Sequence, residues 1–211
     1  MRDAKRGQFY MTDPHRSVAN NSAVYEMQPT NTELMDEWVA LMKSGSGERG
    51  IFNRGSLAST MPKRRYDYFK MTGFIGEDGV VHGSVGTNPC AEIILQSKQF
   101  CNLSEVIARA HDTEASLLRK ARLAAILGTY QSTLTNFQYI SKEWVEHCAD
   151  ERLLGVSITG QWDSPAARKE EVMRAVRDMA VKTNVTYAKR FGVARSMSVT
   201  AVKPSGTVSQ T

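Results

Sequence analysis

Apolar residues recur at helical spacing in three long segments of the chain. Residues 32–43, with Thr32 as a candidate N-cap, carry an apolar stripe made of Leu34, Trp38, Leu41 and Met42. Residues 113–132 are amphipathic. Residues 164–191 begin with Ser164-Pro165, a capping serine before a proline at the first helical position, and stop at Gly192. The spacing therefore predicts three helices.

The two later helices supply most of the predicted core. Their apolar stripes are expected to pack on a sheet. The first contributes Leu117, Leu118, Ala121, Ala124, Ala125 and Leu127. The second contributes Val172, Val176, Met179, Thr183, Val185 and Tyr187.

Shorter apolar runs predict the strands of that sheet. The strand candidates are residues 50–53, 92–96, 153–159 and the alternating segment 196–202. Residues 61–79 are basic and then glycine-rich, which predicts a surface excursion. Strands that alternate with helices indicate an α/β fold. No internal repeat and no domain boundary is evident in the sequence.

Three polar side chains precede the strand candidate at 92–96. Asn88, Cys90 and Glu92 are spaced by two, so in an extended segment they share one face. An unpaired buried carboxylate is costly, so that face is expected to meet water or a substrate. The sequence predicts a polar tip that leads into a buried strand.

Residues 203–209, Lys-Pro-Ser-Gly-Thr-Val-Ser, form a second polar segment. Ser205 and Thr207 offer hydroxyls, and the backbone around Gly206 offers N–H groups, which together can cradle a phosphate. The alternative is an ordinary Pro-Gly turn.

Several blocks together resemble the large catalytic subunit of ribonucleotide reductases. They are Asn-Pro-Cys-Ala-Glu at 88–92, Cys-Asn-Leu-Ser at 101–104, Arg-Leu-Leu-Gly-Val-Ser-Ile-Thr-Gly at 152–160 and Pro-Ser-Gly-Thr at 204–207. They follow the family's order and spacing, which makes a chance match improbable. The resemblance implies part of a ten-stranded α/β barrel, a single catalytic domain over residues 1–211, with a central finger loop at about 86–103.

The resemblance also implies roles in a thiyl-radical reduction of ribonucleotides for DNA precursor synthesis. Cys90 would take the 3′ hydrogen of the ribose, Glu92 would be the general base on the 3′ hydroxyl, and Asn88 would hydrogen-bond the ribose or orient Glu92. Cys101 would be half of a redox dithiol that a thioredoxin-like or other external dithiol regenerates. Ser205, Gly206 and Thr207 would bind the substrate phosphate.

The short interval between Cys90 and Cys101 resembles the adenosylcobalamin-dependent class II enzymes, so adenosylcobalamin is the cofactor that the resemblance implies. The alternative is a class I type subunit, in which the two cysteines usually lie further apart. Residues 16–22 resemble the loop that binds an effector nucleotide, with Arg16, Asn20 and Asn21 as candidates. An ordinary surface turn is the competing interpretation.

The chain departs from the family pattern in its thiols and its length. The family's second redox cysteine lies upstream of the finger loop, and no cysteine precedes Cys90. Cys148, in a helical stretch, is expected to be an ordinary buried or half-buried thiol. An eight-stranded barrel takes roughly 250 residues, so a chain of 211 residues is expected to be an internal fragment of a reductase.

Composition adds weaker constraints. A net charge of +5 suits an anionic ligand such as a nucleotide, and a solvated basic face explains it equally well. Three cysteines, with no signal peptide or membrane-spanning run, favour a reducing cytoplasmic setting and no membrane partner. No zinc-ligand spacing occurs, and the four histidines are scattered, so no metal site is expected.

Two other functions fit parts of the sequence. One is a nucleotide-binding remnant without turnover. The other is a nucleic-acid-binding module centred on the basic run Lys63-Arg64-Arg65, with Tyr66, Tyr68 and Phe69 nearby for stacking. The run matches no recognised motif, and a solvent-exposed loop is the favoured interpretation.

Overall fold

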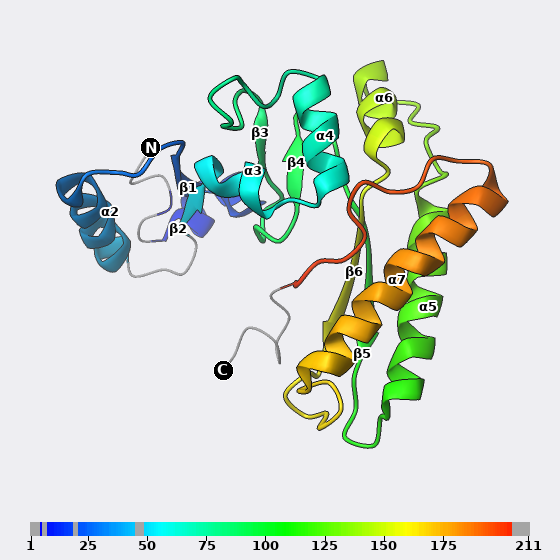
Figure 1. Cartoon of the computed structure of the whole chain (residues 1–211). Coiled ribbons are helices and arrows are strands. Elements are labelled where there is room, and N and C mark those ends of the chain that lie inside the picture. Colours follow the sequence, from blue (N-terminus) through cyan, green and yellow to red (C-terminus); the bar gives the residue numbers. More distant parts are fainter. Residues whose placement is uncertain (1–4, 6–7, 19–20, 45–48, 204–211) are drawn as a thin grey trace. The chain divides into compact units, whose positions relative to one another are not determined.

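The computed structural model describes residues 5, 8–18, 21–44 and 49–203 (Figure 1). The chain divides into two compact units, residues 1–91 and 92–211. Each unit mixes helices with short strands, so the α/β class is confirmed. The described sheets are small, and both the ten-stranded barrel and the single catalytic domain stay predictions. Within the described ranges, no helix is long and apolar enough to cross a bilayer.

The first unit is built around a pair of parallel strands. Strand β1 (Asn21–Tyr25) pairs with β2 (Arg49–Asn53), with Asn21 opposite Arg49 and Tyr25 opposite Asn53. The strand predicted at 50–53 is therefore confirmed. The other elements are α1 (Phe9–Thr12), η1 (Pro14–Val18), α2 (Asn31–Ser44), η2 (Arg54–Ser56), α3 (Leu57–Thr60), α4 (Lys63–Met71) and β3 (Val85–Thr87).

Helix α2 forms as predicted, but its cap and its buried face differ from the prediction. The backbone N–H of Glu33 donates to Thr30 Oγ1 at 3.3 Å, and the N–H of Thr30 donates to Glu33 Oε2 at 2.8 Å. This reciprocal pair makes Thr30, not Thr32, the capping residue. The helix buries Glu37 and Ala40, whereas most of the predicted stripe is exposed: Leu34, Trp38 and Met42. Periodicity identifies a stripe but not the neighbour that covers it.

The predicted surface excursion at 61–79 is wrong. Helix α4 occupies its first half and buries Phe69 completely. The Phe69 ring lies 5.2 Å from the Phe74 ring, and the guanidinium of Arg65 lies 4.9 Å from the Phe69 centroid. Arg65 is only 3% exposed. Nearly the whole basic side chain is buried here against an aromatic ring, which net charge along the sequence does not reveal.

The second unit is built around a pair of parallel strands that a third segment joins by a single bridge. Strands β5 (Asn102–Ile107) and β6 (Leu154–Thr159) run parallel, with Asn102 opposite Leu154 and Ile107 opposite Thr159. On the other edge of β6, the N–H of Val156 donates to Val199 O at 2.9 Å. The segment predicted as a strand at 196–202 thus makes one parallel bridge, Val156 to Thr200. The short strand β4 (Ile94–Gln96) precedes β5, inside the predicted range 92–96.

Helices α5 (Glu114–Gln131) and α7 (Glu170–Phe191) lie side by side and cover one face of β5 and β6 (Figure 1). Most of the predicted α5 contacts are confirmed, with Leu117, Ala121 and Ala125 fully buried. Leu127 is 54% exposed, so its predicted contact is wrong. The core between these elements contains Val106, Ala108, Leu117, Ala121, Ile158, Ala167, Val172 and Val176.

Helix α7 ends where the sequence predicts but begins later. Gly192 adopts a left-handed φ of 70° and stops it. Ser164 caps only an isolated turn, since its Oγ accepts from Ala167 N at 3.3 Å, and the helix begins at Glu170. Val172, Val176 and Thr183 are buried as expected, but Val185 is 42% exposed, so its predicted core contact is wrong.

Candidate functional site

Cys90 lies on a tight turn and not on an extended segment. The N–H of Ala91 donates to Asn88 O at 3.0 Å, and Ala91 has a φ of 64°. The alternation argument that put Asn88, Cys90 and Glu92 on one face therefore fails locally. The thiol of Cys90 is exposed. A non-glycine residue with positive φ is uncommon and occurs often near functional sites.

Glu92 presents a buried carboxylate that lacks a partner. Both of its oxygens are shielded from solvent, and neither has a hydrogen-bond partner among the described residues. An unsatisfied buried acceptor is costly, and an unpaired charge more so. The carboxylate therefore has free capacity to accept a proton or a hydrogen bond from a ligand.

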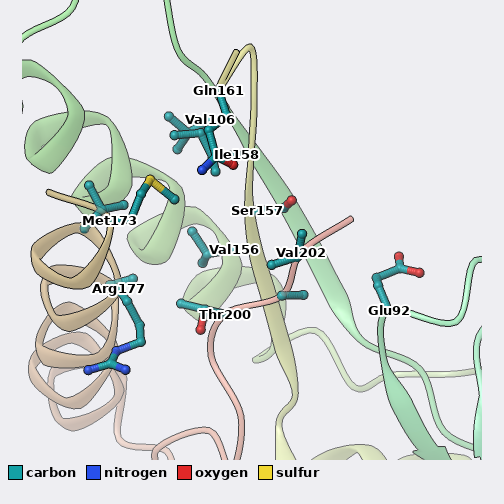
Figure 2. Close-up of a pocket in the computed structure, with 13 residues that line it drawn as sticks. Glu92, Val106, Val156, Ser157, Ile158, Gln161, Met173, Arg177, Thr200 and Val202 are labelled. Carbon is teal, nitrogen blue, oxygen red and sulfur yellow. The ribbon is translucent and has the colours of Figure 1, made fainter. Parts of the chain in front are cut away.

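Glu92 lines a cavity of about 440 Å³ in the second unit. Figure 2 shows Met173 and Arg177, from α7, on one side of β6 and Glu92 on the other. The walls near α7 are largely apolar. The remaining lining residues are Val106, Val156, Ser157, Ile158, Gln161, Val176, Ala180, Thr200, Ala201 and Val202.

Cys101 lies at the face of β5 and β6 that α5 and α7 leave uncovered. A Cβ on Gly155 would lie 3.3 Å from Cys101 Sγ and 2.5 Å from Leu103 Cδ2. Only glycine leaves room for both side chains, so Gly155 creates the space in which the Cys101 thiol lies. Directly after Cys101, the N–H of Asn102 donates to Leu153 O at 2.9 Å and joins the segment to β6.

The same face holds a buried hydroxyl that the sequence did not single out. Ser157 is 4% exposed, and its Oγ accepts from the backbone N–H of Lys203 at 3.1 Å. This bond ties the residue preceding Pro204 to the sheet. A sequence signal for this face was available: Gly155 and Ser157 are small residues spaced by two in an otherwise apolar strand.

Cys148 behaves as the sequence predicts. It lies in α6 (Lys142–Glu151) and is 7% exposed. Burial raises the pKa of its thiol, and a hydrogen bond from the backbone of Phe100 offsets part of that rise. A protonated, buried thiol is a poor nucleophile, so Cys148 is not a candidate for chemistry.

Several predicted site residues are not assembled by the structure. Arg16 lies in η1, with its guanidinium 3.4 Å from Asp13, and Asn21 begins β1 rather than lying in a loop. Asn20 lies outside the described residues, as do the predicted phosphate ligands Ser205, Gly206 and Thr207.

The nucleic-acid hypothesis is weakened at both ends of its basic run. Arg65 is buried, and Lys63 Nζ pairs with Asp67 at 2.7 Å. Across the described ranges, no group of three or more His, Cys, Asp or Glu side chains is placed to hold a metal ion.

Comparisons with known proteins agree with the resemblance seen in the sequence. No family model matches the chain. Its relatives include the adenosylcobalamin-dependent ribonucleoside-triphosphate reductase of Levilactobacillus brevis, 25% identical over 226 aligned positions, and that of Lactobacillus leichmannii, 27% identical over 231. Each alignment covers 93% of this chain and 28% of the relative. The chain thus spans little more than a quarter of the length of these reductases.

A solved structure of a B12-dependent (class II) ribonucleotide reductase is also similar, with 26% identity and a TM-score of 0.45. The match covers 63% of this chain and 23% of that one. The similarity to adenosylcobalamin-dependent ribonucleotide reductases, predicted from the sequence, is confirmed by the relatives.

Proposed function

We propose that this chain is an internal segment of the catalytic region of an adenosylcobalamin-dependent ribonucleotide reductase, an oxidoreductase that makes deoxyribonucleotides by a thiyl-radical mechanism. The observation that carries this proposal is the Glu92 carboxylate, which is buried and without a hydrogen-bond partner among the described residues, on a residue that lines a cavity. A ribose hydroxyl is a donor that would satisfy it. The names of the relatives support the choice of reaction.

The proposed chemistry assigns one task to each side chain. Cys90, as a thiyl radical, takes the 3′ hydrogen of the ribose, while Glu92 accepts the proton of the 3′ hydroxyl. The 2′ hydroxyl leaves as water. Two electrons come from Cys101 and a second thiol, which become a disulfide, and the Cys90 S–H returns hydrogen to C3′. An external dithiol of the thioredoxin type then reduces the disulfide.

The cofactor proposed by resemblance is adenosylcobalamin. The relatives are named as dependent on this cofactor, which when bound would supply the radical that Cys90 carries. The roles above are those of the chain's own residues.

The fold proposal extends the same resemblance. Strands β5 and β6 would belong to a ten-stranded barrel, with residues 86–103 as its finger loop and 203–209 as the phosphate loop. The link from Ser157 to Lys203 supports this arrangement, because it fixes the start of the phosphate loop on the sheet. Arg16, Asn20 and Asn21 remain proposed effector contacts.

A single-turnover experiment tests the function. The native polypeptide that carries this sequence, isolated from its source cells, is mixed with adenosylcobalamin and a ribonucleotide but no external reductant. We expect deoxyribonucleotide to form and the free thiol of Cys101 to disappear, as mapped by peptide mass spectrometry, while Cys148 stays a thiol. Product formed with Cys101 still free would contradict the assigned roles. Nucleotide binding without any product would favour the remnant without turnover.

A further inference from the structure

A set of buried hydrogen bonds lies beneath the turn that precedes Cys101. Glu151, the last residue of α6, is fully buried, and its Oε1 accepts from Gln96 Nε2 at 2.7 Å and from Gln99 Nε2 at 3.0 Å. The Oε1 of Gln99 in turn accepts from the backbone N–H of Gln96 at 3.0 Å. Both glutamines are at most 5% exposed. We refer to Gln96, Gln99 and Glu151 as the clamp.

Two further hydrogen bonds tie α6 to the turn and to the segment at Met197. Gln99 Nε2 donates to His147 O at 3.0 Å, and the backbone carbonyl of Glu151 accepts from Met197 N at 2.8 Å. A buried carboxylate surrounded by amides gains little stability over an apolar side chain of similar volume. Such a network restricts its side chains to one arrangement, because each hydrogen bond limits the positions of both its donor and its acceptor.

The outer side of the turn is held as well. Lys98 adopts a φ of 57° and forms an ion pair with Glu143, while His147 Nδ1 lies 2.7 Å from Ser97 O. The Phe100 ring lies 5.2 Å from the ring of Phe137 and 6.3 Å from that of Trp144. Residues 96–100 therefore have little freedom to move relative to α6.

We propose that the clamp is a positioning device for the Cys101 thiol. Cys101 follows the turn directly, and the bond from Asn102 to Leu153 fixes the chain on its other side. The thiol is thereby held over Gly155. Thiol–disulfide chemistry depends strongly on such placement, since a misplacement of about 1 Å can lower a rate about a hundredfold. The proposal rests on the proposed function in taking Cys101 as a reacting thiol.

Thiol alkylation of the native polypeptide, followed by peptide mass spectrometry, tests the clamp without requiring turnover. Gln99→Leu removes three hydrogen bonds, one each to Gln96 N–H, Glu151 Oε1 and His147 O. We expect the alkylation rate of Cys101 to rise about tenfold. Because the opening is local, that rate should depend only weakly on added urea. Gln96→Leu should act in the same direction and provides a second variant if the first folds poorly.

The matched control is Val172→Ala, which weakens the core away from the clamp. Even where it lowers global stability as much as Gln99→Leu does, it should leave the alkylation rate of Cys101 in the absence of urea unchanged. The proposal is overturned if the two variants raise the rate equally, or if Gln99→Leu leaves it unchanged. In turnover, Gln99→Leu should lower kcat and leave KM unchanged, whereas a purely structural role would lower only the amount of active protein. Failure of turnover itself would contradict the proposed function but not the alkylation result.

Discussion

Asn184 and Ser196 are joined by two hydrogen bonds inside the second unit. Asn184 Nδ2 donates to Ser196 Oγ at 2.9 Å, and its Oδ1 accepts from the Ser196 backbone N–H at 3.0 Å. Asn184 Nδ2 also donates to Thr129 Oγ1 at 3.0 Å, so one amide connects α7, α5 and the segment that leads to Lys203. All three residues are at most 1% exposed. A satisfied network of this kind fixes one arrangement of its members.

Asn184→Ala should therefore cost about 2–4 kcal/mol of unfolding free energy, because it leaves the buried N–H of Ser196 without an acceptor. Urea denaturation measures the loss. Thr186→Ala, on the exposed side of the same helix, is the control and should change the free energy by less than about 0.5 kcal/mol. Equal, small effects of both substitutions would show that the network contributes nothing.

Two glycines with the same backbone conformation should respond differently to alanine. Gly160 and Gly192 have φ of 74° and 70°. A Cβ on Gly160 would lie 2.2 Å from Ala108 O, whereas one on Gly192 would meet nothing within 4 Å. Gly192→Ala should cost about 1–2 kcal/mol for the left-handed backbone alone, and Gly160→Ala more than about 3 kcal/mol. Thermal unfolding measures the loss of stability in each variant. Equal losses would contradict the close approach between Gly160 and Ala108 O.

Protonation of the Asp112 carboxylate should lower the stability of the folded protein in acid. Hydrogen bonds from Lys120 and then from Ser116 lower the pKa of its carboxyl to about 2. Because the folded pKa lies below the unfolded one, the contribution is complete above about pH 4 and disappears as pH falls toward 2. Since Lys120 is partly exposed, we expect a loss on the order of 1–2 kcal/mol over that window. Asp112→Asn should flatten the pH dependence of the urea midpoint there; a wild-type profile in that variant would rule Asp112 out as its source.

Glu92 should stabilise the protein less than an uncharged side chain does. A buried carboxylate without a hydrogen-bond partner is costly, so Glu92→Gln should raise the unfolding free energy by about 1–2 kcal/mol, and on the proposed function turnover should fall sharply. Glu105→Gln, on an exposed position of β5, is the control and should leave stability nearly unchanged. A destabilised Glu92→Gln variant would mean that the carboxylate has a partner in the folded protein.

The sequence predicted elements where local composition alone decides them. A run of apolar and small residues gives β6, and Gly192 ends α7 because it tolerates a left-handed φ. Cys148 was correctly predicted as buried. The turn at Cys90 was missed because Ala91 adopts a backbone state that alanine rarely adopts.

Long-range pairings were beyond the reach of sequence patterns. Glu151 and Gln96 are 55 positions apart, as are Asn184 and Thr129, and no periodicity connects them. The same limit applies to α2. The sequence identified its apolar stripe but did not predict that most of the stripe is exposed. Of the candidate site, the residue types of Cys90, Glu92 and Cys101 were available from motifs, whereas the buried state of the Glu92 carboxylate required the fold.

Steady-state ribonucleotide reduction by variants of the complete native polypeptide tests the central claim most directly. Cys90→Ser should abolish deoxyribonucleotide formation, because serine cannot carry the radical that takes the 3′ hydrogen. Cys148→Ser, which changes a buried thiol outside the chemistry, should retain most of the activity of the folded protein. Normal reduction by the Cys90→Ser variant would contradict the assignment of this chain to the catalytic region of a ribonucleotide reductase.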